Sequence, residues 1–131
     1  FSPAMKLNIT ATVTAVDFHP TQPLVATASI DGQVYIKNLI NGENIWSYKL
    51  NPSKRIGLEF NQDGTQLIVA GERLLLFSWA SGQEENSSLK NLKFVCFNSD
   101  NSRFAAVSNN GNVIIGEVES LSIIKRYKND Y

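Results

Sequence analysis

The chain has very few of the residues that most catalytic and metal centres require. Its 131 residues include one cysteine, Cys96, and one histidine, His19. A single cysteine excludes an intrachain disulfide and a cysteine-rich metal site within this sequence, and no histidine or cysteine spacing suits zinc. A serine–histidine or cysteine–histidine centre would have to use His19, which stands between Phe18 and Pro20 at a turn. We therefore assign His19 a structural role and expect no enzyme activity, no metal and no cofactor.

Net charge and long apolar runs are also absent. Twelve basic and twelve acidic residues give a formal net charge of zero, which argues against a dominant nucleic-acid or membrane-surface role. No apolar run approaches the roughly 20 residues that a bilayer span needs. The eight glycines are scattered singly, so the sequence lacks a glycine-rich phosphate loop. No signal peptide is visible either, and we expect an intracellular protein, cytoplasmic or nuclear.

What the sequence does contain is a motif that returns at a regular interval. Three phenylalanines, Phe18, Phe60 and Phe97, each close a short apolar segment, and they lie 42 and 37 residues apart. A polar turn follows each phenylalanine, and another apolar run follows each turn. A fixed period in this range is typical of a stacked array of one supersecondary unit. Such arrays are mostly binding scaffolds, in which no single unit can bury its own apolar face.

Short apolar runs separated by turn residues predict an all-β fold with four strands in each repeat. We expect strands at 13–18, 24–30, 33–39 and 44–50, then at 54–60, 66–70 and 73–79, and finally at 93–97, 103–108, 112–118 and 121–127. The polar composition of residues 83–88 argues against a fourth strand in the second repeat. Asp31-Gly32, Asn41-Gly42 and Asn110-Gly111 supply the positive φ that tight hairpin turns need, and Ser81-Gly82 matches Asn41-Gly42.

The first repeat carries the clearest family resemblance. The segment Val13-Thr14-Ala15-Val16-Asp17-Phe18-His19-Pro20, followed by Ala28-Ser29-Ile30-Asp31-Gly32-Gln33-Val34-Tyr35-Ile36, resembles the WD-repeat β-propellers. That family typically shows V-x-x-V-x-F-x-P, then S-x-D-G-x-V-x-I before a Trp-Asp pair. The resemblance covers about residues 11–127. The Trp-Asp columns hold Lys37-Asn38, Phe77-Ser78 and Gly116-Glu117. Only Ser29 and Asp31 match the family's buried Trp–Ser–His–Asp network, so we expect it to be incomplete in every blade.

The resemblance implies a β-propeller of four-stranded antiparallel blades, with about three blades present as a partial ring. We expect blades at 11–52, 53–90 and 91–131, with residues 1–10 as a remnant or outer strand of a preceding blade. Propellers have about 4–8 blades. We therefore expect the chain to be part of a larger propeller, completed by further sequence, by a partner chain or by self-association.

Basic residues cluster where the last strand of one blade passes to the first strand of the next. In the WD-repeat family these connections share one face with the turns between second and third strands, and that face is the usual docking surface. The resemblance therefore implies a set of candidate partner-binding residues on this face: Asp31, Lys54, Arg55, Glu72, Arg73, Lys90 and Asn109. A solvated basic edge is the alternative interpretation of these lysines and arginines.

The function implied by the resemblance is that of a non-catalytic protein–protein interaction scaffold in a multi-subunit assembly. The alternative is a nucleic-acid or phosphate-binding face that uses Lys54, Arg55, Lys90 and Lys93. A propeller enzyme or a sugar-binding propeller would need polar or metal-binding residues that converge on the central channel, and the sequence shows none.

Two further predictions concern individual side chains. We expect the aromatic residues Trp46, Tyr48 and Trp79 to pack between blades rather than to serve as exposed anchors. We expect Cys96 to be a small buried hydrophobic residue, because it stands in an apolar, strand-like run.

Overall fold

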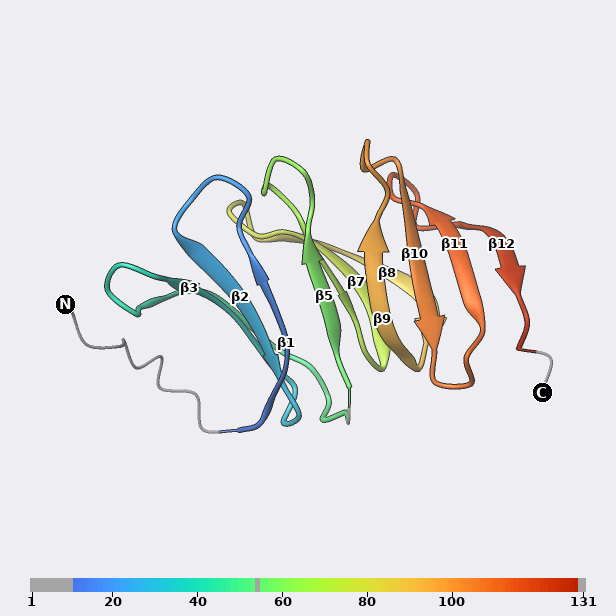
Figure 1. Cartoon of the computed structure of the whole chain (residues 1–131), viewed down its shortest axis with the longest axis horizontal. Helices are drawn as coiled ribbons and strands as arrows, with labels where there is room; N and C mark the ends of the chain where they lie inside the picture. The colour runs from blue at the N-terminus through green and yellow to red at the C-terminus, as the bar shows by residue number, and fades with distance from the viewer. Residues whose placement is uncertain (1–10, 54, 130–131) are drawn as a thin grey trace.

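The computed structural model of the chain describes residues 11–53 and 55–129, and these residues form three four-stranded antiparallel sheets. Figure 1 shows the sheets side by side, with the chain passing from one to the next. The first sheet contains β1 (Val13–Phe18), β2 (Leu24–Ser29), β3 (Gln33–Asn38) and β4 (Asn44–Lys49). The second contains β5 (Gly57–Phe60), β6 (Leu67–Ala70), β7 (Arg73–Ser78) and β8 (Gln83–Lys90). The third contains β9 (Leu92–Phe97), β10 (Arg103–Ser108), β11 (Val113–Glu117) and β12 (Ile123–Tyr127).

Within every sheet the strands pair in chain order, which makes each sheet a simple meander. β5 contacts both β1 and β9, so the first strands of the three blades lie next to one another in the array (Figure 1). This arrangement of twisted sheets around an axis is that of propeller blades, so the all-β prediction and the partial-propeller prediction are confirmed. Among the described residues no helix is long and apolar enough to cross a membrane.

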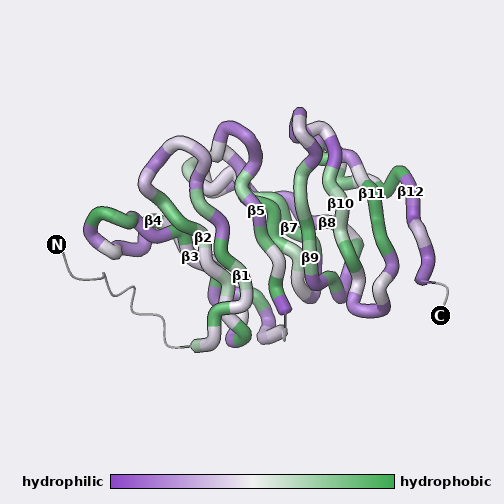
Figure 2. The backbone as a smooth tube through the Cα atoms, viewed as in Figure 1, coloured by the Kyte–Doolittle hydropathy of each residue, from purple (hydrophilic) through white to green (hydrophobic). Residues whose placement is uncertain are grey.

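Two separate cores hold the three blades together. One core lies between the first and second blades and includes Val34 and Leu75, while the other lies between the second and third and includes Leu74 and Ile114. Side chains alternate along each third strand, so one column faces the preceding blade and the other faces the next blade. In Figure 2 the strands are mostly green and the turns at both edges are mostly purple, as expected when the strands are buried and the turns meet solvent.

The prediction for residues 83–88 is wrong, because these residues belong to the eight-residue strand β8. β8 pairs antiparallel with β7, with Phe77 opposite Glu84 and Leu76 opposite Glu85. β7 is buried over Leu74–Phe77, and the free edge of such a strand imposes an extended conformation on its neighbour. Because β8 is the outer strand, most of its side chains meet solvent, and its polarity costs little.

The prediction for Cys96 is also wrong, since its thiol is exposed. Cys96 lies on β9 at the position that Asp17 holds on β1 and Glu59 on β5, each one residue before the closing phenylalanine. At these positions the side chain points toward the following blade. In the part of the chain that the structure describes, no fourth blade lies beside β9, so no following blade covers the Cys96 side chain.

Other local predictions agree with the structure in kind and differ at the ends. The four predicted turn glycines all have positive φ: Gly32, Gly42, Gly82 and Gly111. β5 begins at Gly57 rather than at Lys54, and β12 begins at Ile123 because Leu121 has a φ of 54°. Residues 1–10, predicted as part of a preceding blade, lie outside the described residues.

The predicted aromatic packing between blades is confirmed. The ring of Phe77 on the second blade lies 4.8 Å from the ring of Trp46 and 4.7 Å from that of Tyr48 on the first blade, measured between centroids. Trp79 packs against the same core.

The buried network of the family is incomplete in the first blade, as expected. The Ser29 hydroxyl is buried and has no hydrogen-bond partner among the described residues, and the Asp31 carboxylate accepts from the Gln33 amide instead. Lys37 stands in the family's tryptophan column and is 2% exposed. Its ammonium donates to Asn44 and lies 4.5 Å from the ring centroid of Tyr35, and burial lowers the pKa of this lysine.

Candidate functional site

The connections between blades run along one edge of the array, directly beside the turns that join second and third strands. At the first junction the Leu50 amide donates to the Gly32 carbonyl over 2.8 Å, and the Ser53 amide donates to the Ile30 carbonyl over 3.2 Å. The chain that leaves β4 is therefore fastened to the β2–β3 turn by its backbone. These two backbone hydrogen bonds fix the loop without involving any side chain that a partner could contact.

The second junction repeats the arrangement. The Asn91 amide donates to the Glu72 carbonyl over 2.9 Å, and the Leu92 amide donates to the Gly71 carbonyl over 2.7 Å. The Asn109 amide then donates to the Asn91 carbonyl over 2.8 Å, which joins the β10–β11 turn to the same connection. We call this edge the docking face: the β2–β3, β6–β7 and β10–β11 turns together with residues 50–53, Arg55, Ile56 and Asn91.

Of the predicted partner-binding residues, the structure places six on or beside the docking face, and Lys54 lies outside the described residues. Asp31 is half-buried in the β2–β3 turn, while the other five are exposed: Arg55, Glu72, Arg73, Lys90 and Asn109. Glu72 accepts a hydrogen bond from the side-chain amide of Asn51, so the β6–β7 turn is also tied to the preceding connection.

Arg55 and Lys93, which are 38 residues apart in the sequence, meet at one pocket of about 310 Å³. The guanidinium carbon of Arg55 lies 5.9 Å from the ring centroid of Phe94, and the ammonium of Lys93 lies 5.8 Å from the same centroid. We call this hollow the basic pocket, and its remaining lining residues come from the inner strands and the residue before β5: Thr14, Ala15, Ile56 and Gly57.

Lys90 does not join the basic pocket. It lines a separate hollow of about 430 Å³ between β8 and the β10–β11 turn, together with Asn109 and Arg126. The four basic residues predicted as one phosphate-binding face are thus divided. Arg55 and Lys93 are brought together, Lys90 is not, and Lys54 is not described.

A glycine makes the basic pocket possible. A Cβ atom on Gly57 would lie 2.9 Å from the Cα of Phe94 and 3.0 Å from the carbonyl oxygen of Lys93. Real Cβ atoms do not approach backbone so closely, so any side chain on β5 at this point would push β9 away. Gly57 therefore lets the second and third blades approach backbone to backbone, which brings Lys93 and Phe94 beside Arg55.

Deeper along the inner strands, two carboxylates join consecutive blades. The Phe60 amide donates to Asp17 over 2.8 Å, and the Phe97 amide donates to Glu59 over 3.0 Å. Partial burial raises the pKa of Asp17 and of Glu59, while these amide hydrogen bonds lower it in part. Sequence reasoning missed this repeated bridge. The sequence carries a signal for this bridge, because an acidic residue precedes the closing phenylalanine in two of the three repeats.

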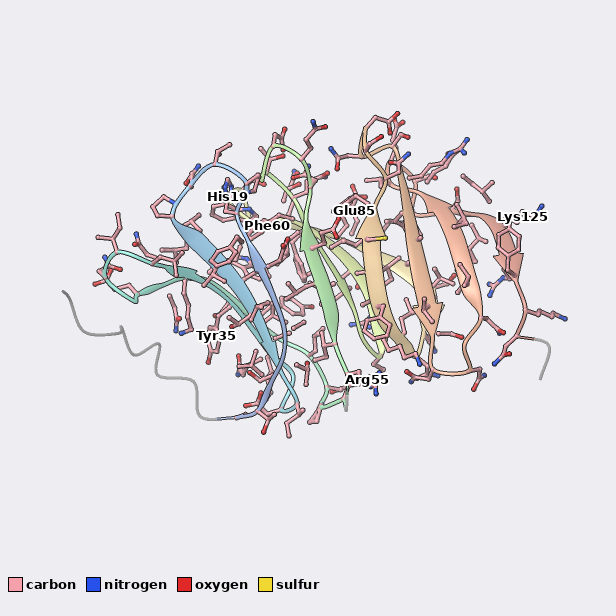
Figure 3. The ribbon with its side chains drawn as sticks, viewed as in Figure 1. His19, Tyr35, Arg55, Phe60, Glu85 and Lys125 are labelled. Carbon is pink, nitrogen blue, oxygen red and sulfur yellow. The ribbon has the colours of Figure 1, made fainter. Side chains whose placement is uncertain are left out.

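At the opposite edge from the docking face, His19 joins the first blade to the second (Figure 3). Its Nδ1 accepts from the amides of Thr21, over 3.2 Å, and Gln22, over 3.0 Å, which leaves Nε2 to donate to the Gly64 carbonyl over 3.1 Å. The indole of Trp79 donates to the same carbonyl over 2.9 Å. Figure 3 places His19 beside Phe60 at one edge and Arg55 at the other. These contacts agree with the structural role predicted for this histidine.

Comparison with known proteins agrees with the geometry. Residues 4–36 match the family model described as "WD domain, G-beta repeat". A segment of 41 residues, 30% of the chain, is 54% identical to the nuclear distribution protein PAC1 of Komagataella phaffii and covers 8% of that protein. The solved structure of U3-55K superposes with a TM-score of 0.80 over 93% of the chain and 41% of U3-55K, at 12% sequence identity, which shows a shared fold.

The fold and the stacked blades define a β-propeller segment. Within this segment, residues 4–36 match a WD repeat, and the described residues form three blades. The chain spans less than half the length of the U3-55K chain and less than a tenth of the PAC1 relative. WD-repeat propellers are generally non-catalytic scaffolds for protein interactions.

Proposed function

We propose that this chain is a non-catalytic scaffold segment that binds another protein through the docking face, within a multi-subunit assembly. The observation that supports this proposal is the set of backbone hydrogen bonds that join the loops of that face. At both junctions the connection between blades is hydrogen-bonded to a neighbouring turn, so loops from all three blades form one continuous edge. Binding residues are often carried on loops that a rigid scaffold positions, and such loops lose little conformational freedom when a partner binds.

The side chains on this edge suit a polar contact surface. Glu72, Lys90 and Asn109 are exposed, and as one acidic, one basic and one neutral residue they do not form a field of one sign. The apolar and aromatic side chains of Trp46 and Phe77 are used between blades. They hold the scaffold together and are not available as anchors for a partner.

The proposal extends to the rest of the ring. Val16 is 64% exposed and Phe18 is 70% exposed on the first blade. Apolar side chains at these inner-strand positions are covered where two blades of this chain meet. A further blade, supplied by the same polypeptide, by a second chain or by a second copy, would cover them at that end. We also propose an intracellular location, which the name of the nuclear distribution relative supports.

Photo-cross-linking that compares the two edges of the blades tests the proposed function. A photoreactive amino acid replaces Lys90 or Asn109 on the docking face, or Gln22 or Glu119 in exposed turns elsewhere, one position at a time in the full polypeptide. We expect discrete cross-linked proteins from the docking-face positions and far weaker products from Gln22 and Glu119. Equal products from all four positions, or stronger products from the two comparison turns, would contradict the proposal.

The alternative of a nucleic-acid or phosphate-binding face has one specific observation in its favour, the meeting of Arg55 and Lys93 at one pocket. Binding of this kind would weaken steeply as salt rises, because each phosphate contact releases counterions. A salt titration of an oligonucleotide complex therefore separates this alternative from protein docking.

A further inference from the structure

The basic pocket holds two positive charges that the described residues leave unneutralised. None of its lining residues is acidic, and neither Arg55 nor Lys93 forms an ion pair within the described part of the chain. Each cation lies near the same Phe94 ring, so the two charges are no farther apart than the sum of their distances to its centroid.

The two cations come from different blades, and the fold brings them together at a place where solvent has access. Arg55 precedes β5 and Lys93 lies at the start of β9, and the backbones of these two strands approach closely at Gly57. Two cations that line one hollow beside an aromatic ring suit an anionic oxygen group. Such a group would accept hydrogen bonds from both the guanidinium and the ammonium, and these charge-assisted bonds are about twice as strong as neutral ones.

The remaining walls of the pocket are mainly apolar. Ala15, Ile56 and Phe94 supply carbon surface, and Thr14 supplies the only other polar side chain among the described lining residues. At about 310 Å³ the pocket is at the small end of the range for ligand sites. It has room for one anionic side chain and part of an apolar neighbour, which is the size of a short peptide epitope.

The surroundings favour a peptide over a nucleic acid. Asp31 and Glu72 lie on the same docking face, and the chain as a whole carries no net charge. A polyanion laid along this face would meet those two carboxylates after leaving the basic pocket. A peptide with a single acidic side chain would not.

We propose that the basic pocket binds an acidic side chain of the partner protein, either a carboxylate or a phosphorylated hydroxyl, next to an apolar residue of the same segment. This inference rests on the proposed function, because it names the chemistry of the partner at one point of the docking face. Arg55 and Lys93 hold the anionic group, while Phe94 and Ile56 contact the apolar neighbour.

An oriented peptide library tests the inference on the full chain. Four libraries share degenerate flanking positions and differ only in the central residue, which is glutamate, phosphoserine, glutamine or lysine. We expect the chain to retain the glutamate or phosphoserine library at least 5-fold more than the glutamine library and to reject the lysine library. The comparison between glutamate and phosphoserine identifies the source of the anionic group.

Charge-removing variants locate the binding. Arg55→Gln and Lys93→Gln should each reduce retention of the preferred library at least 3-fold. Lys125→Gln is the matched control, because its ammonium also lies near an aromatic ring, 5.3 Å from the centroid of Tyr127, but on the outer strand β12 of the third blade. The control variant should bind as the wild type does. Figure 3 shows Arg55 and Lys125 far apart on the array.

Three results would overturn the inference. Equal retention of the glutamate and glutamine libraries, or retention of neither acidic library, would show that the pocket does not select an anionic side chain. Equal loss from Lys125→Gln would show that only general charge matters. Tighter binding of a single-stranded oligonucleotide than of either acidic library would assign the pocket to nucleic acid. If cross-linking still maps partners to the docking face, the proposed function stands while the pocket inference fails.

Discussion

Replacing Gly57 by alanine tests the close approach of the inner strands. Gly57 is buried on β5, and an added Cβ would meet three backbone atoms of β9, at 2.9 Å from the Phe94 Cα, 3.0 Å from the Lys93 oxygen and 3.2 Å from the Val95 nitrogen. Ordinary contacts of a Cβ begin near 3.4 Å. Backbone of a paired strand cannot rotate out of the way as a side-chain end can, so β9 must shift as a whole.

The expected cost follows from two opposing effects. Overfilling a packed interface by one methyl group costs about 1–3 kcal/mol. Alanine also restricts the unfolded chain more than glycine does, which offsets about 0.4–1 kcal/mol. The net loss should therefore centre on about 1.3 kcal/mol, the difference between the midpoints of the two ranges. Each kcal/mol lowers the melting temperature of a domain of this size range by roughly 2–8 °C.

The measurement is urea unfolding followed by circular dichroism, with Gly71→Ala as the matched control. Gly71 is also buried and lacks a positive φ, but its added Cβ would meet the nearest atom, Ile56 Cγ1, at 3.5 Å. We expect Gly71→Ala to equal or exceed the wild type in stability. Should Gly57→Ala prove as stable as Gly71→Ala, the described contact between β5 and β9 would be refuted.

Three further predictions concern the contacts between blades. Asp17→Asn keeps a side-chain oxygen that accepts from the Phe60 amide and removes the ionisable carboxyl group, whose pKa is raised by burial. A carboxyl group with a raised folded-state pKa stabilises the fold at low pH, and this stability is lost as pH rises through that pKa. The free energy of unfolding of the wild type should therefore fall relative to that of Asp17→Asn in unfolding curves taken from pH 3 upward. His19→Ala should destabilise by about 1–3 kcal/mol in urea unfolding, because two turn amides and the Gly64 carbonyl lose their partner. Phe77→Ala should cost about 3–5 kcal/mol, or prevent folding, because its ring fills the space between two blades; a cost under 1 kcal/mol would contradict the described core.

Much of the fold follows from local patterns in the sequence. β1 and β10 have the predicted bounds, because alternating apolar residues between clear turns leave few options. β8 was missed since its strand conformation comes from its neighbour β7 rather than from its own residues. Propensity is a weak guide for an outer strand whose side chains meet water.

The candidate site was harder to predict, because it depends on distances between residues far apart in the chain. Sequence reasoning selected Arg55 and Lys93 but grouped them with Lys90, which the structure separates from them. The role of Gly57 is invisible in the sequence, since its importance comes from the backbone of another blade. Cys96 was misjudged for a related reason: an apolar strand does not reveal which of its faces a neighbouring blade covers.

The most direct test of the central claim, that one edge of the blades binds the partner, is amide hydrogen exchange of the chain with and without the protein captured by cross-linking. We predict slower exchange on binding in residues 30–32, 50–57, 71–72 and 91–93 and in the β10–β11 turn, with little change elsewhere. Slower exchange in the turns at residues 19–23, 61–66 and 98–102, with no change on the docking face, would contradict the account.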